Sequence, residues 1–546
     1  MDYQAIVIGG GPVGLMTAGE LALAGVFGAA RLNPQSLGGN EQSRSHASLN
    51  RVRVLVVERL AEIDPTIKAG SINVPTIEAF YRRGMRAQVK HEQEKALGRI
   101  TEFIRQRNPH APPVTELPKR AGHFAGIMLD RDNIDDSSPE FARINEFADM
   151  VVIGQQEIEA ILAKRAEELG AEIRRGVEFT ALTSDDEGVT AIVDGQPIRA
   201  SWLVGADGGR SAVRKLAGFD FPGTEPEITG HQAIVELTGA EGLRVGWNRT
   251  PRGIYVYGPT PGRILTVEFD GPPADRDAPI TAAELQQSLR NVSGINVTIT
   301  AVKSATRFTD NCRQVTNYRR GRILLAGDAA HVHTPFGGQG LNLGIGDAMN
   351  LGWKLAAEIN GWAPPGLLDS YTAERHPIGE WVLDWSRAQV ALMRTDWRTN
   401  ALRDVVADLM RTADGAGYFV RKLSGVLHRY PIAGDHPLIG ASAPDFELST
   451  MDTTVRLGEL LHDGRAVLLD LADNRALAEL AAGWASRVNV VGAKCQVPDA
   501  PAGLLVRPDG FVAWASDDSS IGGLSDALHT WFGTPISAES VPELIA

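Results

Sequence analysis

Apolar residues gather in short runs along this chain, and the first runs follow the order of a strand, a glycine turn and a helix. Residues 3–8 (YQAIVI) predict a buried strand, GGGPVG follows at 9–14, and LMTAGELALAG repeats apolar residues at helical spacing. In such a unit Gly9 permits a tight turn, Gly11 lets the backbone approach a pyrophosphate, and Gly14 lets the helix pack on the strand. The pattern therefore predicts a dinucleotide-binding unit.

A second apolar run, VRVLVVERL at 52–60, predicts the next strand and places Glu58 at its end, where an acidic residue would hold ribose hydroxyls. Gly14 and Glu58 are 44 positions apart, whereas about 20 is usual. Residues 27–50 are polar, glycine-rich and without periodicity, and deleting them restores normal spacing. We interpret them as an inserted surface loop, either without function or in contact with the adenosine region.

Two later segments repeat the sequence of a buried strand followed by a polar turn. ASWLVGADGGRSAVR at 200–214 ends its strand at Asp207-Gly208 and continues to Arg214. RILLAGDAAHVHTPFGGQGLNLGIGD at 322–347 ends its strand at Gly327-Asp328 and continues into a proline- and glycine-rich loop that enters a helix. A second GxGxxG fingerprint, which a dedicated NADPH domain would carry, is not found in the sequence.

These three motifs, in this order, resemble the class A flavoprotein aromatic hydroxylases, in which all three surround one FAD. The resemblance covers nearly the whole chain and is closest to bacterial aromatic polyketide hydroxylases of the angucycline and anthracycline type. Segments such as GHFAGIMLD and NLGWKLAAEINGWAPPGLLDSYTAERHP carry it. It implies an α/β fold: a Rossmann-like FAD-binding domain of the glutathione reductase type, a β-sheet substrate domain, and a thioredoxin-like C-terminal domain like that of phenol hydroxylases.

The resemblance also implies which residues hold the non-covalent FAD. Asp328 would contact ribityl or ribose hydroxyls, and Lys68 stands where the family usually carries arginine. Gln155 and Glu159 match the Q-x-x-x-E opening of a helix that faces FAD. The full expected set is Gly9, Gly11, Pro12, Val13, Gly14, Glu58, Arg59, Lys68, Gln155, Asp207, Gly208, Arg214, Gly327, Asp328, Pro335, Gly338, Gly340, Leu341 and Asn342.

No catalytic base is identified from the sequence, and only Pro335 and Gly338 in the flavin loop are candidates for a catalytic role. His331 and His333 beside that loop are expected to be structural. Arg210 and Arg214 are candidates to attract the phosphates of the nicotinamide, or are simply solvated. Asp347 is interpreted as an acidic residue at a helix start, and Trp353 as a core residue.

The domain boundaries expected from these patterns are discontinuous. The FAD-binding domain takes 1–75, 150–217 and 311–395, and the substrate-binding domain takes the β-rich stretches 76–149 and 218–310, which include GIYVYGP and ILTVEFDG. Residues 396–546 form a helical linker and, from about 436, the thioredoxin-like domain. Since no CxxC follows its first strand, AVLLDL, packing or dimer contact is its expected role.

Composition and charge argue against several classes of partner and site for this chain. A chain of 546 residues with 43% hydrophobic content can build several cores, and its formal charge of −13 disfavours nucleic acid. Cys312 and Cys495 suggest neither a disulfide framework nor a metal site. The apolar stretch at 5–26 lacks a basic start and is interrupted by glycines, so neither a signal peptide nor a membrane span is expected. We expect a cytoplasmic monomer or homodimer.

The activity implied by the resemblance is monooxygenation of a multi-ring phenol. NADPH would reduce FAD, O2 would add at the flavin C4a carbon, and the resulting hydroperoxide would transfer one oxygen atom to an electron-rich ring carbon. Two alternatives stay open at this point. The same chemistry could perform a Baeyer–Villiger insertion or modify an antibiotic, or the protein could bind FAD without catalysis.

Overall fold

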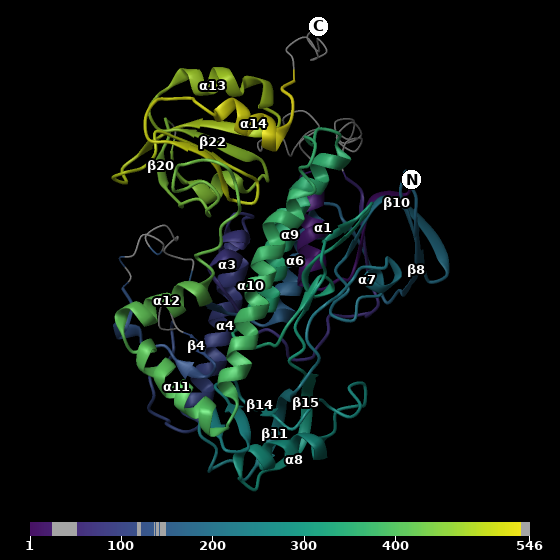
Figure 1. Ribbon diagram of the computed structural model, residues 1–546, viewed down its shortest axis with the longest axis vertical. Helices are drawn as coiled ribbons and strands as arrows, with labels where there is room; N and C mark the ends of the chain where they lie inside the picture. Colours follow the sequence, from purple (N-terminus) through teal and green to yellow (C-terminus); the bar gives the residue numbers. More distant parts are fainter. Residues whose placement is uncertain are drawn as a thin grey trace.

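The computed structural model describes residues 1–24, 52–116, 122–135, 137, 141, 149–451 and 453–536. The predicted insertion at 27–50 lies outside these residues. Three parts follow one another along the long axis of the molecule: a C-terminal unit, a large sheet with its helices, and a smaller sheet at the far end (Figure 1). Two long helices, α9 (Gln339–Ile359) and α10 (Ser370–Met393), run along the same axis between these parts.

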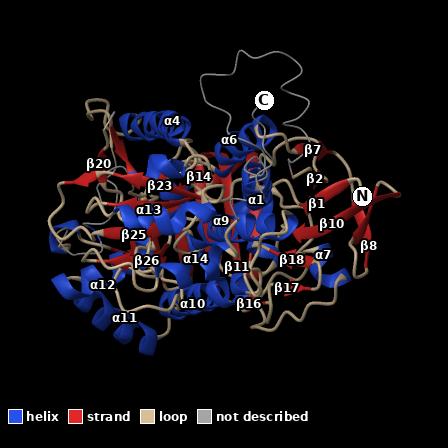
Figure 2. Cartoon of the chain, turned by 90° about the horizontal axis from the view of Figure 1, so that it is seen from above, coloured by secondary structure: helices blue, strands red, loops and turns tan. Residues whose placement is uncertain are grey.

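The largest sheet has eight strands, five of which are parallel in the order β18-β10-β1-β2-β7. Helices pack against it, among them α1 and α9 (Figure 2). Its strands are buried on both faces and read as continuous apolar runs. The predicted strands over 3–8 and before Glu58 are confirmed. The strands are β1 (Tyr3–Ile8), β2 (Val54–Glu58), β7 (Glu172–Arg175), β10 (Gln196–Gly205) and β18 (Ile323–Leu325), with antiparallel β8 (Phe179–Ser184), β9 (Val189–Val193) and β17 (Arg319–Arg320).

The helix after the first strand begins earlier than its apolar periodicity suggests. Helix α1 spans Pro12–Ala24, so proline occupies its first turn, where the missing N–H costs no hydrogen bond. Helix α6 (Gln155–Glu168) begins at the residue that the Q-x-x-x-E pattern predicted. The short helix α7 (Ala212–Leu216) follows the Asp207-Gly208 turn.

The smaller sheet is antiparallel, in the order β12-β13-β14-β11-β15, and α8 (Ala282–Ser293) packs on one face. The strands predicted from GIYVYGP and ILTVEFDG are confirmed as β13 and β14. The five strands are β11 (Thr229–Thr238), β12 (Gly246–Thr250), β13 (Gly253–Tyr257), β14 (Arg263–Glu268) and β15 (Thr298–Phe308).

The expectation of a β-rich stretch over 76–149 is wrong for its first part. Residues 74–105 form the helices α3 (Val74–Tyr81) and α4 (Arg86–Arg105). Asn73 caps α3, and the buried side chains of α4 recur at helical spacing, as Val89, Leu97, Ile100 and Phe103 show. Strands in this stretch are short: β3 (Ser71–Ile72) pairs with β6 (Val151–Val152), and β4 (His123–Phe124) pairs with β5 (Ile127–Met128).

The loop of the third motif enters a helix, as predicted, and that helix begins at Gln339. Three further helices follow it, so this stretch comprises α9, α10, α11 (Trp397–Met410) and α12 (Ala413–Ser424). The interpretation of Asp347 as a residue at a helix start is therefore wrong. It lies in the middle of α9, and its side chain is fully buried. The buried carboxylate is compensated by His331 and Arg375, which belong to other elements. Trp353 is buried, as predicted.

The C-terminal unit contains a four-stranded sheet in the order β23-β22-β25-β26 and a three-stranded sheet, β21-β20-β24. The predicted first strand, AVLLDL, is confirmed, and Pro508-Asp509-Gly510 forms the turn between two later strands. The elements are β20 (Glu447–Ser449), β21 (Thr454–Arg456), β22 (Ala466–Asp470), α13 (Arg475–Ala481), β23 (Val488–Gly492), β24 (Lys494–Cys495), β25 (Gly503–Val506), β26 (Val512–Ser516) and α14 (Leu524–Phe532). None of the helices in the described ranges is both long and apolar enough to cross a bilayer.

Candidate active site

The three sequence motifs meet at one edge of the large sheet. Strands β1, β10 and β18 are adjacent and parallel, with Ile8 beside Gly205 and Gly205 beside Leu325. Because parallel strands end at the same edge, the turns that follow them lie side by side, and Glu58 ends the neighbouring strand β2. This edge is where open α/β sheets bind their ligands.

The glycines of the first motif meet different needs. A Cβ atom at Gly9 would lie 2.3 Å from the carbonyl oxygen of Ala206, and one at Gly14 would lie 1.9 Å from that of Gly9. Both glycines therefore allow close packing of backbone on backbone. A Cβ at Gly11 would meet no atom within 4 Å. The backbone at Gly11 is thus open to approach, which fits a pyrophosphate at the N-terminus of α1.

Val13 joins the first motif to the third. A Cβ at Gly327 would lie 2.9 Å from a methyl carbon of Val13, and a Cβ at Gly344 of α9 would lie 2.4 Å from the same carbon. The valine side chain therefore fills a recess that only glycines leave open. Pro12, the residue before it, is also buried. This packing holds the N-terminal half of α9 close to α1.

Glu58 is oriented by two backbone groups. Its Oε2 accepts the N–H of Gly10 at 2.6 Å, and its Oε1 accepts the N–H of Leu60 at 2.8 Å. The carboxylate therefore lies at the edge of the glycine turn, where the sequence placed a ribose-binding acid. Its neighbour Arg59 is exposed.

The second motif supplies an acid and an arginine with different roles. Asp207 Oδ2 accepts the N–H groups of Ala212 and Val213 at 2.7 and 3.1 Å, while its buried Oδ1 has no partner among the described residues. Arg214 is buried and donates to the carbonyls of Gly209 and Ala329 at 2.7 and 2.9 Å. It therefore ties the second motif to the third. Arg210 is exposed and pairs with Asp277.

The third motif depends on a buried carboxylate that follows it by nineteen to twenty residues. Asp347 accepts the N–H of Gly327 at 3.0 Å, His331 Nε2 at 2.7 Å and Arg375 Nε at 2.8 Å. Burial opposes ionisation of Asp347, but Arg375 and His331 outweigh it and hold the pKa below its ordinary value. Asp347 thus fixes the turn that presents the exposed Asp328, and His331 is structural, as predicted.

The loop that leads into α9 exposes backbone groups. Pro335 is exposed, and Gly338, at the helix N-terminus, has a φ of 63°, which favours glycine. Asn342 donates to the Gly338 carbonyl at 2.6 Å and accepts the Asn73 N–H at 3.0 Å, so it holds this loop against α3. The first turn of α9, which contains Gly340 and Leu341, has no acidic side chain, and its N–H groups suit an electronegative ligand edge.

Lys68 and Gln155 come together on neighbouring segments. Gln155 donates its backbone N–H to the Ala69 carbonyl at 3.0 Å and its side-chain amide to Glu159 at 2.9 Å. Lys68 pairs with Asp64 at 2.7 Å. Burial raises the pKa of the Glu159 carboxyl above its ordinary value. The Q-x-x-x-E pattern therefore forms one hydrogen-bonded unit.

Comparison with known proteins identifies this arrangement. The family described as FAD binding domain matches residues 2–386, and the family described as Aromatic-ring hydroxylase, C-terminal, matches residues 436–535. The chain belongs to the FAD-binding aromatic-ring hydroxylases. It is an FAD-dependent monooxygenase, and NADPH is the electron donor typical of this group.

Three relatives illustrate the likeness of this monooxygenase to enzymes of known name. It is 39% identical over 565 residues to anhydrotetracycline monooxygenase of Streptomyces rimosus, covering 98% of this chain and 100% of the relative. It is 37% identical over 539 residues to rifampicin monooxygenase of Streptomyces venezuelae, covering 97% and 99%. Among solved structures, the anhydrotetracycline hydroxylase OxyS from Streptomyces rimosus has a TM-score of 0.82 at 36% identity, covering 98% and 100%.

Beside the flavin loop the monooxygenase gathers aromatic side chains that sequence reasoning did not single out. Phe336 of the loop lies 6.2 Å from Trp247 of β12 and 5.8 Å from Phe308 of β15, measured between ring centroids. His123 lies 4.4 Å from Trp247. Burial, with added repulsion from Arg263 and Arg403, lowers the pKa of His123 to about 4. The only sequence signal was the segment GHFAGIMLD, which carried the family resemblance without a role.

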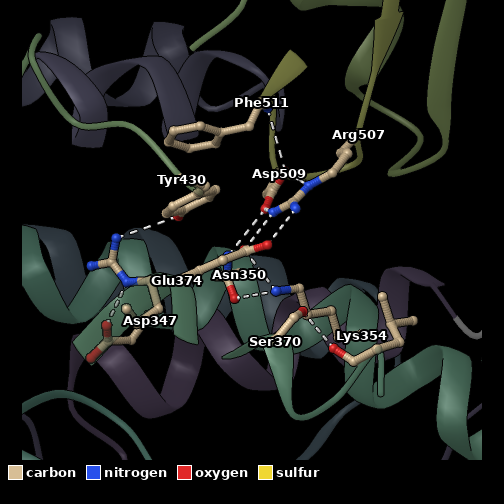
Figure 3. A network of polar contacts seen from close by, with 11 residues as sticks. Asp347, Asn350, Lys354, Ser370, Glu374, Tyr430, Arg507, Asp509 and Phe511 are labelled. Carbon is tan, nitrogen blue, oxygen red and sulfur yellow. Dashed lines mark hydrogen bonds and ion pairs between the residues drawn. The ribbon is translucent and has the colours of Figure 1, made fainter. Parts of the chain in front are cut away.

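Sequence reasoning also missed a buried ionic network between α9, α10 and the C-terminal unit (Figure 3). Arg507 donates to both carboxylate oxygens of Glu374 at 2.7 and 2.8 Å and also pairs with Asp509. Lys354 donates to Glu374 and to Asn350, each at 2.8 Å. On the same side, Arg375 reaches from Asp347 to the Tyr430 hydroxyl at 3.4 Å, and Tyr430 stacks on Phe511. The C-terminal unit is therefore connected to the helix that supports the flavin loop.

Proposed function

We propose that this protein hydroxylates a multi-ring phenol or aromatic polyketide. The observation that carries the proposal is the arrangement of the motif edge: an open backbone approach at Gly11, a glycine loop at Gly338, and an aromatic cluster directly beyond that loop. The two Streptomyces relatives, named for anhydrotetracycline and rifampicin, support a large polycyclic substrate. When bound, FAD takes hydride from NADPH and activates O2 for transfer of one oxygen atom to the substrate.

Different residues of this site would contact different parts of FAD. The N–H groups of Gly11 and Val13, on either side of Pro12, approach the pyrophosphate, and Glu58 holds the ribose. Asp328 binds the ribityl or ribose hydroxyls, and the loop from Gly338 to Asn342 supports the flavin ring. Asp207 offers its unpartnered Oδ1 to the cofactor. The set of contacting residues proposed for FAD is Gly9, Gly11, Pro12, Val13, Gly14, Glu58, Arg59, Lys68, Gln155, Asp207, Gly208, Arg214, Gly327, Asp328, Pro335, Gly338, Gly340, Leu341 and Asn342.

The finer architecture belongs to the same proposal. Parallel strands with the glycine motif after the first strand support a Rossmann-like FAD-binding domain of the glutathione reductase type. The order β23-β22-β25-β26, with helices after β22 and β26, supports a thioredoxin-like C-terminal domain that lacks CxxC. We propose 1–75, 150–217 and 311–395 for FAD, 76–149 and 218–310 for the substrate, and 396–546 for a helical linker that leads, from about 436, into the C-terminal domain.

The test is the absorption spectrum of the purified protein, followed by anaerobic addition of NADPH with and without a panel of multi-ring phenols. The proposal expects flavin bands that bleach with NADPH and bleach faster with a substrate present. Aerobic turnover should then yield a product heavier by one oxygen atom. A bound flavin that stays oxidised with every phenol would contradict the proposal and favour a protein that binds FAD without catalysis.

A second candidate is Baeyer–Villiger insertion of oxygen beside a carbonyl of an antibiotic by the same site, and the name of the rifampicin monooxygenase supports an antibiotic as the substrate. Product mass does not separate the candidates, because ring hydroxylation and Baeyer–Villiger insertion both add one oxygen atom. The position of that atom, read by NMR of the product, decides between them. A hydroxylated ring carbon supports the first candidate, and an oxygen inserted beside a carbonyl supports the second.

A further inference from the structure

Arg263 begins strand β14 on the face of the smaller sheet that carries the aromatic cluster around Phe336. Side chains alternate between the two faces of a strand. Ile264 packs with the helix α8 on one face, whereas Leu265 packs with Phe336 on the other. Arg263 therefore shares the face of Leu265 and lies on the side of the flavin loop.

This face also contacts a segment proposed to hold FAD. Strands β14, β11 and β15 are neighbours (Figure 1), and across them Arg263 lies opposite Ile234, which lies opposite Ser304. Ser304 Oγ accepts the N–H of Ile67 at 2.6 Å, and the next residue, Lys68, is one of the proposed FAD contacts. Neighbouring strands lie about 4.8 Å apart, so Arg263 is about 10 Å from Ser304. The side chain of Arg263 therefore projects from the face of the sheet that is turned toward the proposed FAD site.

Arg263 is a half-buried cation that lacks an anionic partner. Among the residues that the structure describes, none forms a hydrogen bond or an ion pair with its guanidinium. Burial lowers the pKa of Arg263 below its ordinary value, and no carboxylate counteracts it. At Arg507, by contrast, Asp509 and Glu374 outweigh burial and raise the pKa. A charge partly withdrawn from water without a partner costs free energy, and a ligand anion would supply that partner.

The groups near Arg263 add positive charge and do not cancel it. Burial, followed by repulsion from Arg263 and Arg403, lowers the pKa of His123 to about 4, so both arginines lie close to this imidazole. Arg403 donates to the carbonyls of Ala125 and Leu392 at 2.8 and 3.3 Å, and neither of these partners carries a charge. An oxyanion beside His123 would therefore be attracted by two guanidinium groups.

His123 contributes a neutral hydrogen-bond donor beside these cations. Its Nδ1 accepts the N–H of Gly126 at 3.2 Å, so the neutral imidazole carries its proton on Nε2. Nε2 bonds no residue of the described ranges and is not fully buried. The imidazole ring lies 4.4 Å from that of Trp247, which belongs to the aromatic cluster. One oxygen atom beside this cluster can thus meet a cation and a donor together.

We propose that Arg263 is a substrate-positioning residue that binds the aromatic substrate as its phenolate. The inference rests on the proposed hydroxylation and adds the ionised form in which the substrate is held. The phenol gives its O–H proton to water, and Arg263 keeps its own proton throughout. The guanidinium then pairs with the phenolate oxygen, and His123 Nε2 donates to the same oxygen. A phenolate ring is richer in electrons than a phenol ring, so its carbon attacks an electrophilic oxygen more readily.

The test uses alizarin, a dihydroxyanthraquinone that changes colour when a phenol group ionises, with the oxidised holoenzyme and no NADPH. Absorption spectra recorded against pH, at wavelengths beyond the flavin bands, give the pKa of the bound dye. We expect the parent protein to lower the pKa of alizarin by about 1–3 pH units. Arg263→Met should abolish this shift, and Arg263→Lys, which keeps the charge, should retain part of it.

Arg252→Met is the matched control, because Arg252 is exposed in the turn between β12 and β13 of the same sheet. It should keep the full shift, and the flavin content of every variant should equal that of the parent. A parent protein that does not bind alizarin, or that binds it without a shift, would overturn the assignment. A full shift in Arg263→Met, or loss of its flavin, would do the same.

A second variant keeps the proposal testable if Arg263→Met does not fold. His123→Phe retains a ring beside Trp247 and removes the donor. Equilibrium dialysis should show alizarin binding about tenfold more weakly to this variant, with the binding of anthraquinone, which has no hydroxyl, unchanged. Equal losses for both probes, or none for either, would contradict the proposal.

Anthraquinone-2-carboxylate distinguishes a phenolate from a carboxylate as the anion. If Arg263→Lys weakens the binding of this acid and leaves that of alizarin unchanged, the assignment to a phenolate is wrong. None of these measurements uses NADPH or O2. A shifted dye in a protein whose flavin NADPH never reduces would support phenolate binding and contradict the proposed hydroxylation. Hydroxylation that proceeds equally well in Arg263→Met would do the reverse.

Discussion

Two regions of this molecule position the same helix, α9, by opposite means. At the motif edge of the large sheet, glycines bring backbone against backbone, as Gly14 does beneath Gly9 and Gly344 does around Val13. At the boundary with the C-terminal unit, charged side chains do the work, as Arg507 does on Glu374. The first region depends on glycines, which have no side chain to hold the two backbones apart. The second depends on buried ion pairs, and a buried charge that lacks its partner lowers the stability of the fold.

The difference explains why one region was visible in the sequence and the other was not. Each glycine of the first motif answers a local need, so a few neighbouring residues show the pattern. The partners Glu374 and Arg507 are 133 residues apart, and each looks like a solvated residue in its own segment. Only folding makes them a pair with side chains 3% and 0% exposed.

The largest effect is expected from breaking the ionic region. Arg507→Met would leave Glu374 and Asp509 buried with one fewer cation, which should lower the free energy of unfolding by about 3–5 kcal/mol. Chemical denaturation monitored by tryptophan fluorescence measures it. The matched control is Arg475→Met, whose pair with Glu479 is 90% exposed on the arginine side and should contribute less than about 1 kcal/mol. Equal midpoints for the two variants would contradict the comparison.

Substitutions in the glycine region should differ in their effects on stability and on FAD binding. Gly14→Ala places a methyl group against the Gly9 carbonyl, so the turn must shift, at a cost of about 1–3 kcal/mol, and flavin should be lost. Gly11→Ala meets no protein atom, so stability should stay within about 0.5 kcal/mol while affinity for FAD falls. Denaturation midpoints and flavin content measure the two effects. A stable Gly11→Ala protein with full flavin would show that no ligand approaches this backbone.

A side chain at the same edge sharpens the comparison. Asp328 is exposed, whereas Asp347 supports its turn from the buried side. We expect Asp328→Ala to weaken FAD binding about tenfold, the effect of one charge-assisted hydrogen bond, with little change in stability. Flavin released per protein during dialysis measures it. Retention of a full complement of flavin would argue against the proposed contact.

The smallest effect concerns one buried histidine beside each region, His123 near the flavin loop and His428 near the ionic boundary. Burial lowers their pKa values to about 4 and about 3, so the folded protein keeps them neutral while the unfolded chain binds protons below pH 6.5. Stability is therefore fully present above pH 6.5 and is lost as pH falls, by about 1 kcal/mol for each at pH 5.5.

The pH dependence can be checked by denaturation at pH 7.0 and pH 5.5. His428→Phe and His123→Asn should each reduce the difference between the two conditions. His110→Gln, at an exposed position, serves as the control and should leave that difference as in the parent protein. A parent protein whose stability does not change between these pH values would show that neither histidine is kept neutral by the fold.

Much of the fold could be predicted because parallel strands and their turns have local signatures. The strand over 3–8 and the end of β2 at Glu58 followed from apolar runs and neighbouring polar residues, and the helix start at Gln155 followed from the family resemblance. The β-rich interpretation is wrong for the first part of 76–149 because α3 and α4 are amphipathic helices, whose apolar positions recur at helical spacing. Asp347 was misplaced because its role depends on three partners from outside its own turn.

The sequence by itself determined the motif edge, since glycine spacing and strand-ending acids are local consequences of backbone geometry, and with them the FAD-binding family. Only the tertiary structure decided the rest. It placed Asp347 under the Gly327 turn, Arg507 on Glu374, and the ring of Phe336 near Trp247. The physical reason is that burial gives charged and aromatic side chains their partners and their pKa values, and burial is a property of the whole fold.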